Sequence, residues 1–171
     1  MRDHCCMQIR PADDSDLDAI LEIHNHAIRE TTAIWTEIEV ERGDRERWLA
    51  ARQAAGHPVI VAEVDGVLAG YASYGPWREK SGYRLTVENS VYVAGNFQRQ
   101  GVAMVLMVEL IRLAKERGIH VMIAAIDAQN AGSIALHRRL GFGEPMVVTE
   151  VGLKFDRWLD LAFMRLQLSG D

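Results

Sequence analysis

Residues 98–103, with the sequence Gln-Arg-Gln-Gly-Val-Ala, combine the features of a phosphate-binding turn. They follow an apolar segment and a short loop, and they open a long helical pattern. A helix N-terminus offers unpaired N–H groups and a positive dipole end, which suit a pyrophosphate. Gly101 and Ala103 are small enough for the backbone to approach an anion, and Arg99 can add a charge-assisted contact. The segment is neither a P-loop nor a dinucleotide fingerprint. Since Gly and Ala are common near helix starts, an ordinary helix start is the alternative.

Glu88 is the carboxylate best placed for acid–base chemistry. It lies in the middle of a predicted strand, on the face opposite to Val87 and Val91, shortly before the phosphate-binding turn. A carboxylate at such a position is costly to bury unless it is paired or faces a cleft. A free α-amine titrates near ~8, so a general base of modest strength suffices to deprotonate it. Glu88 is our candidate base, and an exposed strand glutamate is the alternative.

The spacing of apolar residues predicts the elements that must position these groups. Asp65-Gly66 indicates a two-residue hairpin turn, and Gly118 closes the long helical pattern. Helices are expected from Leu17 to about Ile28 and over residues 42–55, 101–117 and 130–140; strands are expected at residues 7–10, 59–64, 67–74, 84–93, 120–126 and 159–168, with another after Phe142. The order β-α-α-β-β-β-α-β-α-β-β predicts a mixed α/β single domain over residues 7–168.

Composition excludes several classes of protein. The chain has 171 residues, a net charge of −5 and 49% hydrophobic residues, which is typical of a globular domain. The acidic balance argues against a nucleic-acid partner, and the longest apolar run, at residues 102–108, is far shorter than the ~20 residues of a membrane span. Residues 1–6 lack the apolar stretch of a secretory signal, and we expect them to form a disordered arm. The three possible ligands in this arm, His4, Cys5 and Cys6, are too few for a structural zinc. We therefore expect a cytoplasmic protein without a metal.

The turn at residues 98–103 and a second segment together resemble the GNAT superfamily of N-acetyltransferases. The second segment follows a buried strand and contains Asn130, Ser133, His137 and Gly141-Phe142. In that superfamily the first motif holds the pyrophosphate of acetyl-CoA, and the helix that begins at the asparagine lines the far side of the cofactor. The resemblance implies a central, mixed, mostly antiparallel sheet flanked by helices, with splayed middle strands that form the acetyl-CoA cleft.

Longer segments are similar to the phosphinothricin and methionine sulfoximine acetyltransferases. These segments are residues 31–35, 70–78, 86–93, 120–126 and 151–161, so the resemblance runs through nearly the whole chain. It implies transfer of an acetyl group to the α-amine of methionine sulfoximine, methionine sulfone or phosphinothricin. Asn89 departs from the histidine expected there, and His137 stands where the superfamily usually has a tyrosine. Another amine, such as a protein N-terminus or a polyamine, and a catalytically silent acyl-CoA-binding module are the alternatives.

The resemblance also implies roles for individual residues. Glu88 would act as the base, and His137 or Tyr92 would supply a proton to the departing thiolate. Arg78 and Arg84 would bind the substrate carboxylate, Trp35 and Trp77 would wall the pocket, and Asn89 and Ser90 would contact the substrate oxygens. A homodimer is expected, in which residues 154–158 could close the site from the partner subunit. The residues expected to bind acetyl-CoA are Val91, Tyr92, Val93, Gln98, Arg99, Gln100, Gly101, Val102, Ala103, Met104, Asn130 and Ser133.

Overall fold

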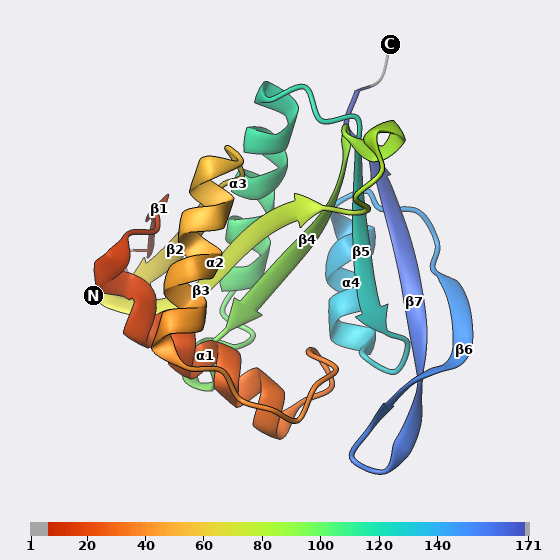
Figure 1. Cartoon of the computed structure of the whole chain (residues 1–171), viewed down its shortest axis with the longest axis horizontal. Helices are drawn as coiled ribbons and strands as arrows, with labels where there is room; N and C mark the ends of the chain where they lie inside the picture. Colours follow the sequence, from red (N-terminus) through yellow and green to blue (C-terminus); the bar gives the residue numbers. More distant parts are fainter. Residues whose placement is uncertain (1–6, 170–171) are drawn as a thin grey trace, which may run out of the picture.

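A seven-stranded sheet with the order β1-β2-β3-β4-β5-β7-β6 runs through the centre of the protein (Figure 1). The computed structural model describes residues 7–169, so the predicted arm with Cys5 and Cys6 lies outside the described residues. Every neighbouring pair of strands is antiparallel except β4 and β5, which are parallel. The strands are β1 Met7–Pro11, β2 Val59–Val64, β3 Val67–Pro76, β4 Thr86–Val93, β5 Val121–Asp127, β6 Met146–Lys154 and β7 Arg157–Gln167.

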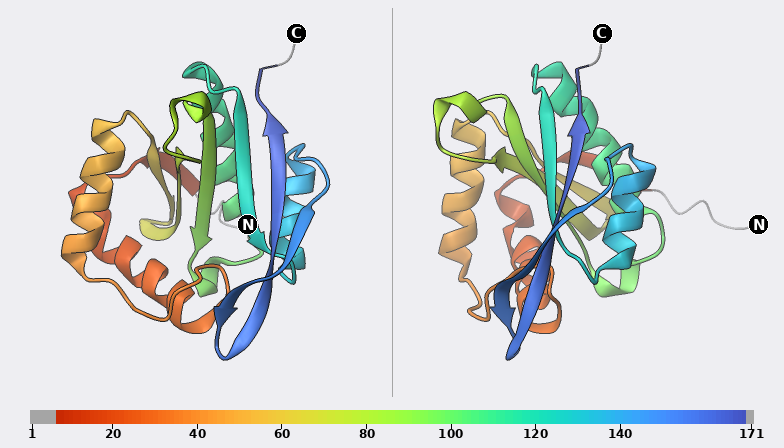
Figure 2. Two further views of the ribbon diagram at one scale, coloured as in Figure 1. Left: turned by 45° about the vertical axis from the view of Figure 1, so that its right-hand side comes forward. Right: turned by 90° about the vertical axis from the view of Figure 1, so that its right-hand side faces the viewer.

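Helices cover both faces of the sheet (Figure 2). Helices α1, Leu17–Glu30, and α2, Arg42–Ala54, lie on one face, and α3, Val102–Glu116, and α4, Ala131–Arg139, lie on the other. The alternation of side chains along the strands divides the core accordingly. Val61 and Tyr71 pack in the cluster that includes α1, whereas the cluster around α3 contains Ile60, Ala62 and Ala72.

The predicted order of helices and strands is confirmed, with small shifts at the ends. Asp65 and Gly66 both have positive φ, 51° and 80°, as a two-residue hairpin turn requires. The strand predicted from Arg84 begins at Thr86, because residues 81–83 form a short 3-10 turn and Arg84 keeps a helical conformation after it. Among residues 7–169, no helix has the length and apolar character needed to cross a membrane.

Strands β4 and β5 are paired over only a short distance. Residues Thr86–Glu88 pair with Val121–Ile123, whereas β4 stays paired with β3 to Val93 and β5 stays paired with β7 to Asp127. Each strand therefore follows its antiparallel partner, and the two strands separate beyond Glu88. The splayed middle strands predicted for the cleft are confirmed.

The separation of β4 and β5 beyond Glu88 is called the fork below. We expect the packing of α3 against the sheet to dominate the stability of this part of the protein. Leu110 is fully buried in the main core cluster, whereas Val108 on the same helix is 54% exposed. Leu110→Ala should lower the free energy of unfolding by about 3 kcal/mol, because it removes buried methyl groups and leaves a cavity. Urea unfolding measures this change, and Val108→Ala is the matched control. Equal effects of the two substitutions would contradict the prediction.

Candidate active site

The separation of β4 and β5 opens a cavity of about 790 Å³. Its floor is the diverging backbone of the two strands, and its walls come from α1, the loop before α3, the first turn of α3, and α4. A cavity of this size is typical of a small-molecule or cofactor site. Within residues 7–169, no three His, Cys, Asp or Glu side chains are grouped so that they could hold a metal ion.

All but one of the predicted cofactor residues line this cavity. The exception is Gln100, which does not line it and whose side-chain amide donates to the carbonyl of Asn96 at 2.8 Å. The residues of the prediction that line the cavity are Val91, Tyr92, Val93, Gln98, Arg99, Gly101, Val102, Ala103, Met104, Asn130 and Ser133.

The start of α3 fits a phosphate group. Gly101 is the N-cap in a left-handed conformation, φ 86°, and a Cβ built on it would meet no atom within 4 Å. No side chain caps this helix end, so the first N–H groups of α3 remain available to an anion. Arg99 also has positive φ, 59°, which is unusual for a residue with a side chain. The turn therefore combines an open backbone, a helix dipole and a cation at one place.

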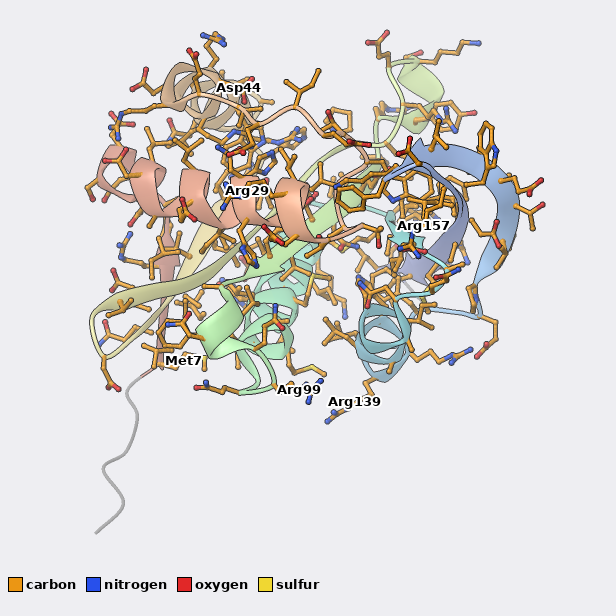
Figure 3. All side chains as sticks on the ribbon, turned by 90° about the horizontal axis from the view of Figure 1, so that it is seen from below. Met7, Arg29, Asp44, Arg99, Arg139 and Arg157 are labelled. Carbon is orange, nitrogen blue, oxygen red and sulfur yellow. The ribbon has the colours of Figure 1, made fainter. Side chains whose placement is uncertain are left out.

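Arg139 is a cationic residue of the cavity that the sequence did not reveal. It lies at the end of α4 and lines the cavity, as Arg99 does, and Figure 3 labels both side chains. Two guanidinium groups in the lining of one cavity favour an anionic ligand. The only signal in the sequence was the basic last turn of α4. This signal is weak, because the helix dipole favours basic residues at the C-terminus of any helix.

Glu88 lies where β4 and β5 part. It is the last residue of β4 that pairs with β5, its partner being Ile123, and its half-buried side chain lines the cavity. Burial raises the pKa of the Glu88 carboxyl, and the charge of Arg78 opposes this rise. A carboxylate that is partly desolvated and faces a cavity is a stronger proton acceptor than a solvated glutamate.

Tyr92 shares the α1 face of β4 with Glu88. Its ring packs against Tyr71 at a centroid distance of 5.2 Å and against His24 at 5.9 Å. Burial raises the pKa of the Tyr92 phenol, so the hydroxyl keeps its proton at neutral pH. Its position in the cavity wall is compatible with donating that proton, and this role stays a prediction.

His137 is buried, and each of its ring nitrogens lies close to an oxygen acceptor. Nδ1 lies 2.8 Å from the carbonyl of Ser133, and Nε2 lies 3.2 Å from Oδ1 of Asn89, whose Nδ2 donates to the carbonyl of Ile123 at 3.0 Å. Because a carbonyl can only accept, Nδ1 carries a proton in this arrangement. Burial lowers the pKa of His137. The amide of Asn89 is thus engaged within the protein, and its predicted contact with substrate oxygens stays a prediction.

The predicted substrate residues separate into two groups. Glu88, Asn89 and Ser90 line the cavity, whereas Trp35, Trp77, Arg78 and Arg84 do not. The Arg78 guanidinium lies over the Trp77 ring at 4.9 Å and is near enough to affect the pKa of Glu88. Arg84 is exposed and donates to the carbonyl of Ser81 at 3.4 Å.

Helix α1 and the loop after it supply a wall that the sequence did not predict. Ile23, His26 and Ala27 lie one turn apart on α1, and Thr31 and Ala33 follow in the loop. Helical periodicity identifies this stripe as one face of α1 but does not reveal what it faces. The polar His26 within an apolar stripe was the one local signal.

Comparison with known proteins agrees with this geometry. Residues 20–142 match the acetyltransferase (GNAT) family. The chain is 51% identical to the methionine sulfoximine/methionine sulfone acetyltransferase of Salmonella typhimurium, with 95% of each chain covered, and 37% identical to the phosphinothricin N-acetyltransferase of Alcaligenes faecalis, with 96% of this chain and 84% of the relative covered. A solved putative acetyltransferase from Salmonella typhimurium with its cofactor acetyl-CoA has a TM-score of 0.95 and 49% identity, covering 97% of this chain and 96% of the other.

A forked sheet, an open helix start and a carboxylate at the apex define an acyltransferase that uses a CoA thioester. The chain belongs to the GNAT family of acetyltransferases and is an N-acetyltransferase with acetyl-CoA as its donor. The fold, enzyme class and cofactor implied by the sequence resemblance are confirmed.

The left-handed glycine at the start of α3 is expected to be needed for cofactor affinity. Gly101→Ala should weaken acetyl-CoA binding about tenfold, because a Cβ disfavours φ 86° by about 1 to 2 kcal/mol and the strained turn would shift the N–H groups at the start of α3. Isothermal titration calorimetry measures this affinity. Gly118→Ala is the matched control, because Gly118 also has positive φ, 70°, beyond the other end of the same helix. A similar loss of affinity in both variants would contradict the prediction.

Proposed function

We propose that this protein transfers the acetyl group of acetyl-CoA to the α-amine of a small amino-acid analogue, namely methionine sulfoximine, methionine sulfone or phosphinothricin. The observation that carries the proposal is Glu88, a half-buried carboxylate with a raised pKa at the apex of the fork. The names of the relatives that cover nearly the whole chain support this substrate class.

The residues around the fork have complementary tasks in this reaction. Acetyl-CoA supplies an activated acetyl group as a thioester. Glu88 accepts the proton of the amine, directly or through water, so that the nitrogen lone pair can form the new bond to the acetyl carbon. Backbone N–H groups of residues 91–93 stabilise the carbonyl oxygen as negative charge develops. The bond from carbon to sulfur breaks, and His137 or Tyr92 returns a proton to the thiolate.

The remaining substrate contacts are proposed near Glu88. Arg78, whose charge reaches Glu88, is the preferred partner for the substrate carboxylate because a guanidinium binds a carboxylate through two hydrogen bonds. Arg84 is the second candidate. Trp35 and Trp77 would bound the acceptor end, and Ser90 and Asn89 would contact its side-chain oxygens. The pair Arg78 and Trp77 already stack on one another, which keeps the guanidinium oriented.

Glu88→Gln tests the base. We expect kcat with methionine sulfoximine to fall at least about a hundredfold, because the amide cannot accept the proton. In the wild type, kcat/KM should fall as the pH is lowered through the raised pKa of Glu88, and this acidic limb should be absent in the variant. Thiol release from acetyl-CoA, with methionine sulfoximine, phosphinothricin and free methionine as acceptors, provides the assay.

Stability provides the control for this variant. Because the pKa of Glu88 is raised in the folded protein, its carboxyl stabilises the fold below the ordinary glutamate pKa, and this contribution is lost as the pH rises through the raised value. The Glu88→Gln protein should therefore be at least as stable as the wild type at neutral pH. Full turnover in a stable Glu88→Gln protein would assign the base to another group, and absence of turnover with all three acceptors in the wild type would contradict the substrate class.

We also propose that two copies of the chain associate through β6. This strand forms the edge of the sheet, and with the turn to β7 it exposes a row of large apolar side chains. Edge strands with such side chains favour association, and a patch of this kind is uncommon on a monomer. The exposed residues are Met146, Val147, Val148, Val151, Leu153, Phe155 and Trp158. The acetyl donor is made and consumed inside cells, so a cytoplasmic location is part of the proposal.

Sedimentation tests the association. Wild-type protein at micromolar concentration should sediment as a dimer, and Val147→Lys should shift it to a monomer, because the ammonium would be buried without a partner at the interface. Val108→Lys on α3 is the matched control, since Val108 is 54% and Val147 50% exposed. A wild type that remains monomeric would contradict the proposal.

A further inference from the structure

Lys154 is a lysine whose side chain is buried, although its position in the sequence predicts an exposed one. It is the last residue of β6, next to a turn, yet it is only 1% exposed. Its Nζ lies 2.6 Å from each of three backbone carbonyl oxygens, those of Ile28, Thr31 and Ile34. An ammonium has three donors, so all of them are used within this subunit. The ammonium of Lys154 is therefore engaged within its own subunit, and closure of the site from a partner subunit by residues 154–158 stays a prediction.

The three carbonyls belong to the end of α1 and the loop that follows. Ile28 lies in the last turn of α1 and Thr31 is its C-cap, so their carbonyls are among those that a helix leaves without N–H partners. A cation is favoured at this end of the helix dipole. The third bond, to Ile34, extends the same support into the loop. Removal of the ammonium would leave one buried and two partly buried acceptors without their donor, which costs more than the loss of exposed bonds.

Residues 31–37, here called the acceptor loop, are held by further contacts from distant parts of the chain. The hydroxyl of Thr32 donates to Asp127 at the end of β5, and the N–H of Phe155 donates to Glu37 at 2.9 Å. The ring of Trp35 lies so close to Gly152 that a Cβ on this glycine would come within 2.2 Å of it. The loop is therefore fixed from β5, β6 and the β6–β7 turn.

This loop borders the cavity and follows α1, which lies on the opposite face of the sheet from α3 and its first turn. Thr31 and Ala33 line the cavity, as does Glu88, whereas Gly101 and the other residues of the cofactor turn belong to a different part of the chain. The contacts of Lys154 and Gly152 thus reach the cavity through the acceptor loop and the end of α1. Their effect should fall on the amine and leave the thioester donor unaffected.

We propose that Lys154 is a positioning residue for the amine substrate: by binding the three carbonyls it holds the acceptor loop in the wall of the cavity. The inference rests on the proposed function, because it assigns the loop to the amine side of that site. Lys154 takes no part in proton transfer, since its three donors are bound to backbone oxygens. A loop displaced by about 1 Å can lower the efficiency of a reaction by up to about a hundredfold.

Steady-state kinetics of Lys154→Met and Lys154→Arg test the proposal. Methionine retains the apolar stem without the donors, and the planar guanidinium of arginine cannot direct three N–H groups to the same three carbonyls. For Lys154→Met we expect the KM for methionine sulfoximine to rise about tenfold or more, with the KM for acetyl-CoA unchanged within about twofold. Lys154→Arg should show the same selectivity with a smaller rise. Lys115→Met, at an exposed lysine of α3, is the matched control and should behave as the wild type.

Hydrogen exchange gives a readout that does not require turnover. In Lys154→Met, amides of the acceptor loop should exchange faster, whereas amides at the start of α3 and their protection by added acetyl-CoA should remain as in the wild type. Equal rises in both KM values, or faster exchange throughout the protein, would overturn the proposal in favour of a general loss of stability. Unchanged exchange in the acceptor loop would overturn it as well. If the wild type has no activity on any amino-acid analogue while the selective exchange is observed, the proposed substrate fails and the anchoring of the loop is retained.

Discussion

The structure depends on the competition between two kinds of strand pairing around β4 and β5. Each of these strands keeps an antiparallel partner over most of its length, β3 for β4 and β7 for β5, while the parallel pairing between them ends at Glu88 and Ile123. In a continuous sheet the backbone of β4 beyond Glu88 would be paired with β5. Because the two strands separate, this backbone faces the cavity instead. The cavity, the position of Glu88 at its apex and the unpaired edge of β4 all follow from this short parallel contact.

Charge is distributed along the cavity according to what each end binds. The start of α3 presents N–H groups and a helix dipole, Arg99 lies in the turn before it, and Arg139 adds positive charge elsewhere in the lining, which suits the phosphates of the donor. Glu88 lies at the apex, where burial raises its pKa and Arg78 limits the rise. In the proposed reaction the amine meets a negative group that accepts its proton, while positive groups hold the donor.

Buried polar side chains hold the walls of the cavity by bonding to the backbone. His137 and Asn89 link α4 to β4 and β5, and Lys154 links β6 to the end of α1. Such groups are costly to bury unless every donor and acceptor is satisfied, and they then allow few alternative arrangements. This rigidity suits an acyl transfer in which the amine and the thioester must be held at the correct distance.

The sequence by itself determined the elements and the cofactor end of the cavity. Alternating and helical patterns predicted the order of strands and helices, and the turn at residues 98–103 predicted the anion-binding helix start, because both depend on residues that are neighbours in the chain. The position of Glu88 on one face of its strand also followed from periodicity alone. Only the tertiary structure decided which distant residues complete the walls: Arg139 lines the same cavity as Arg99, Ile23 and His26 line it from α1, and Lys154 binds Ile28. These contacts join residues far apart in sequence, and no local pattern encodes them, because they result from how the packed helices and the forked sheet bring separate segments together.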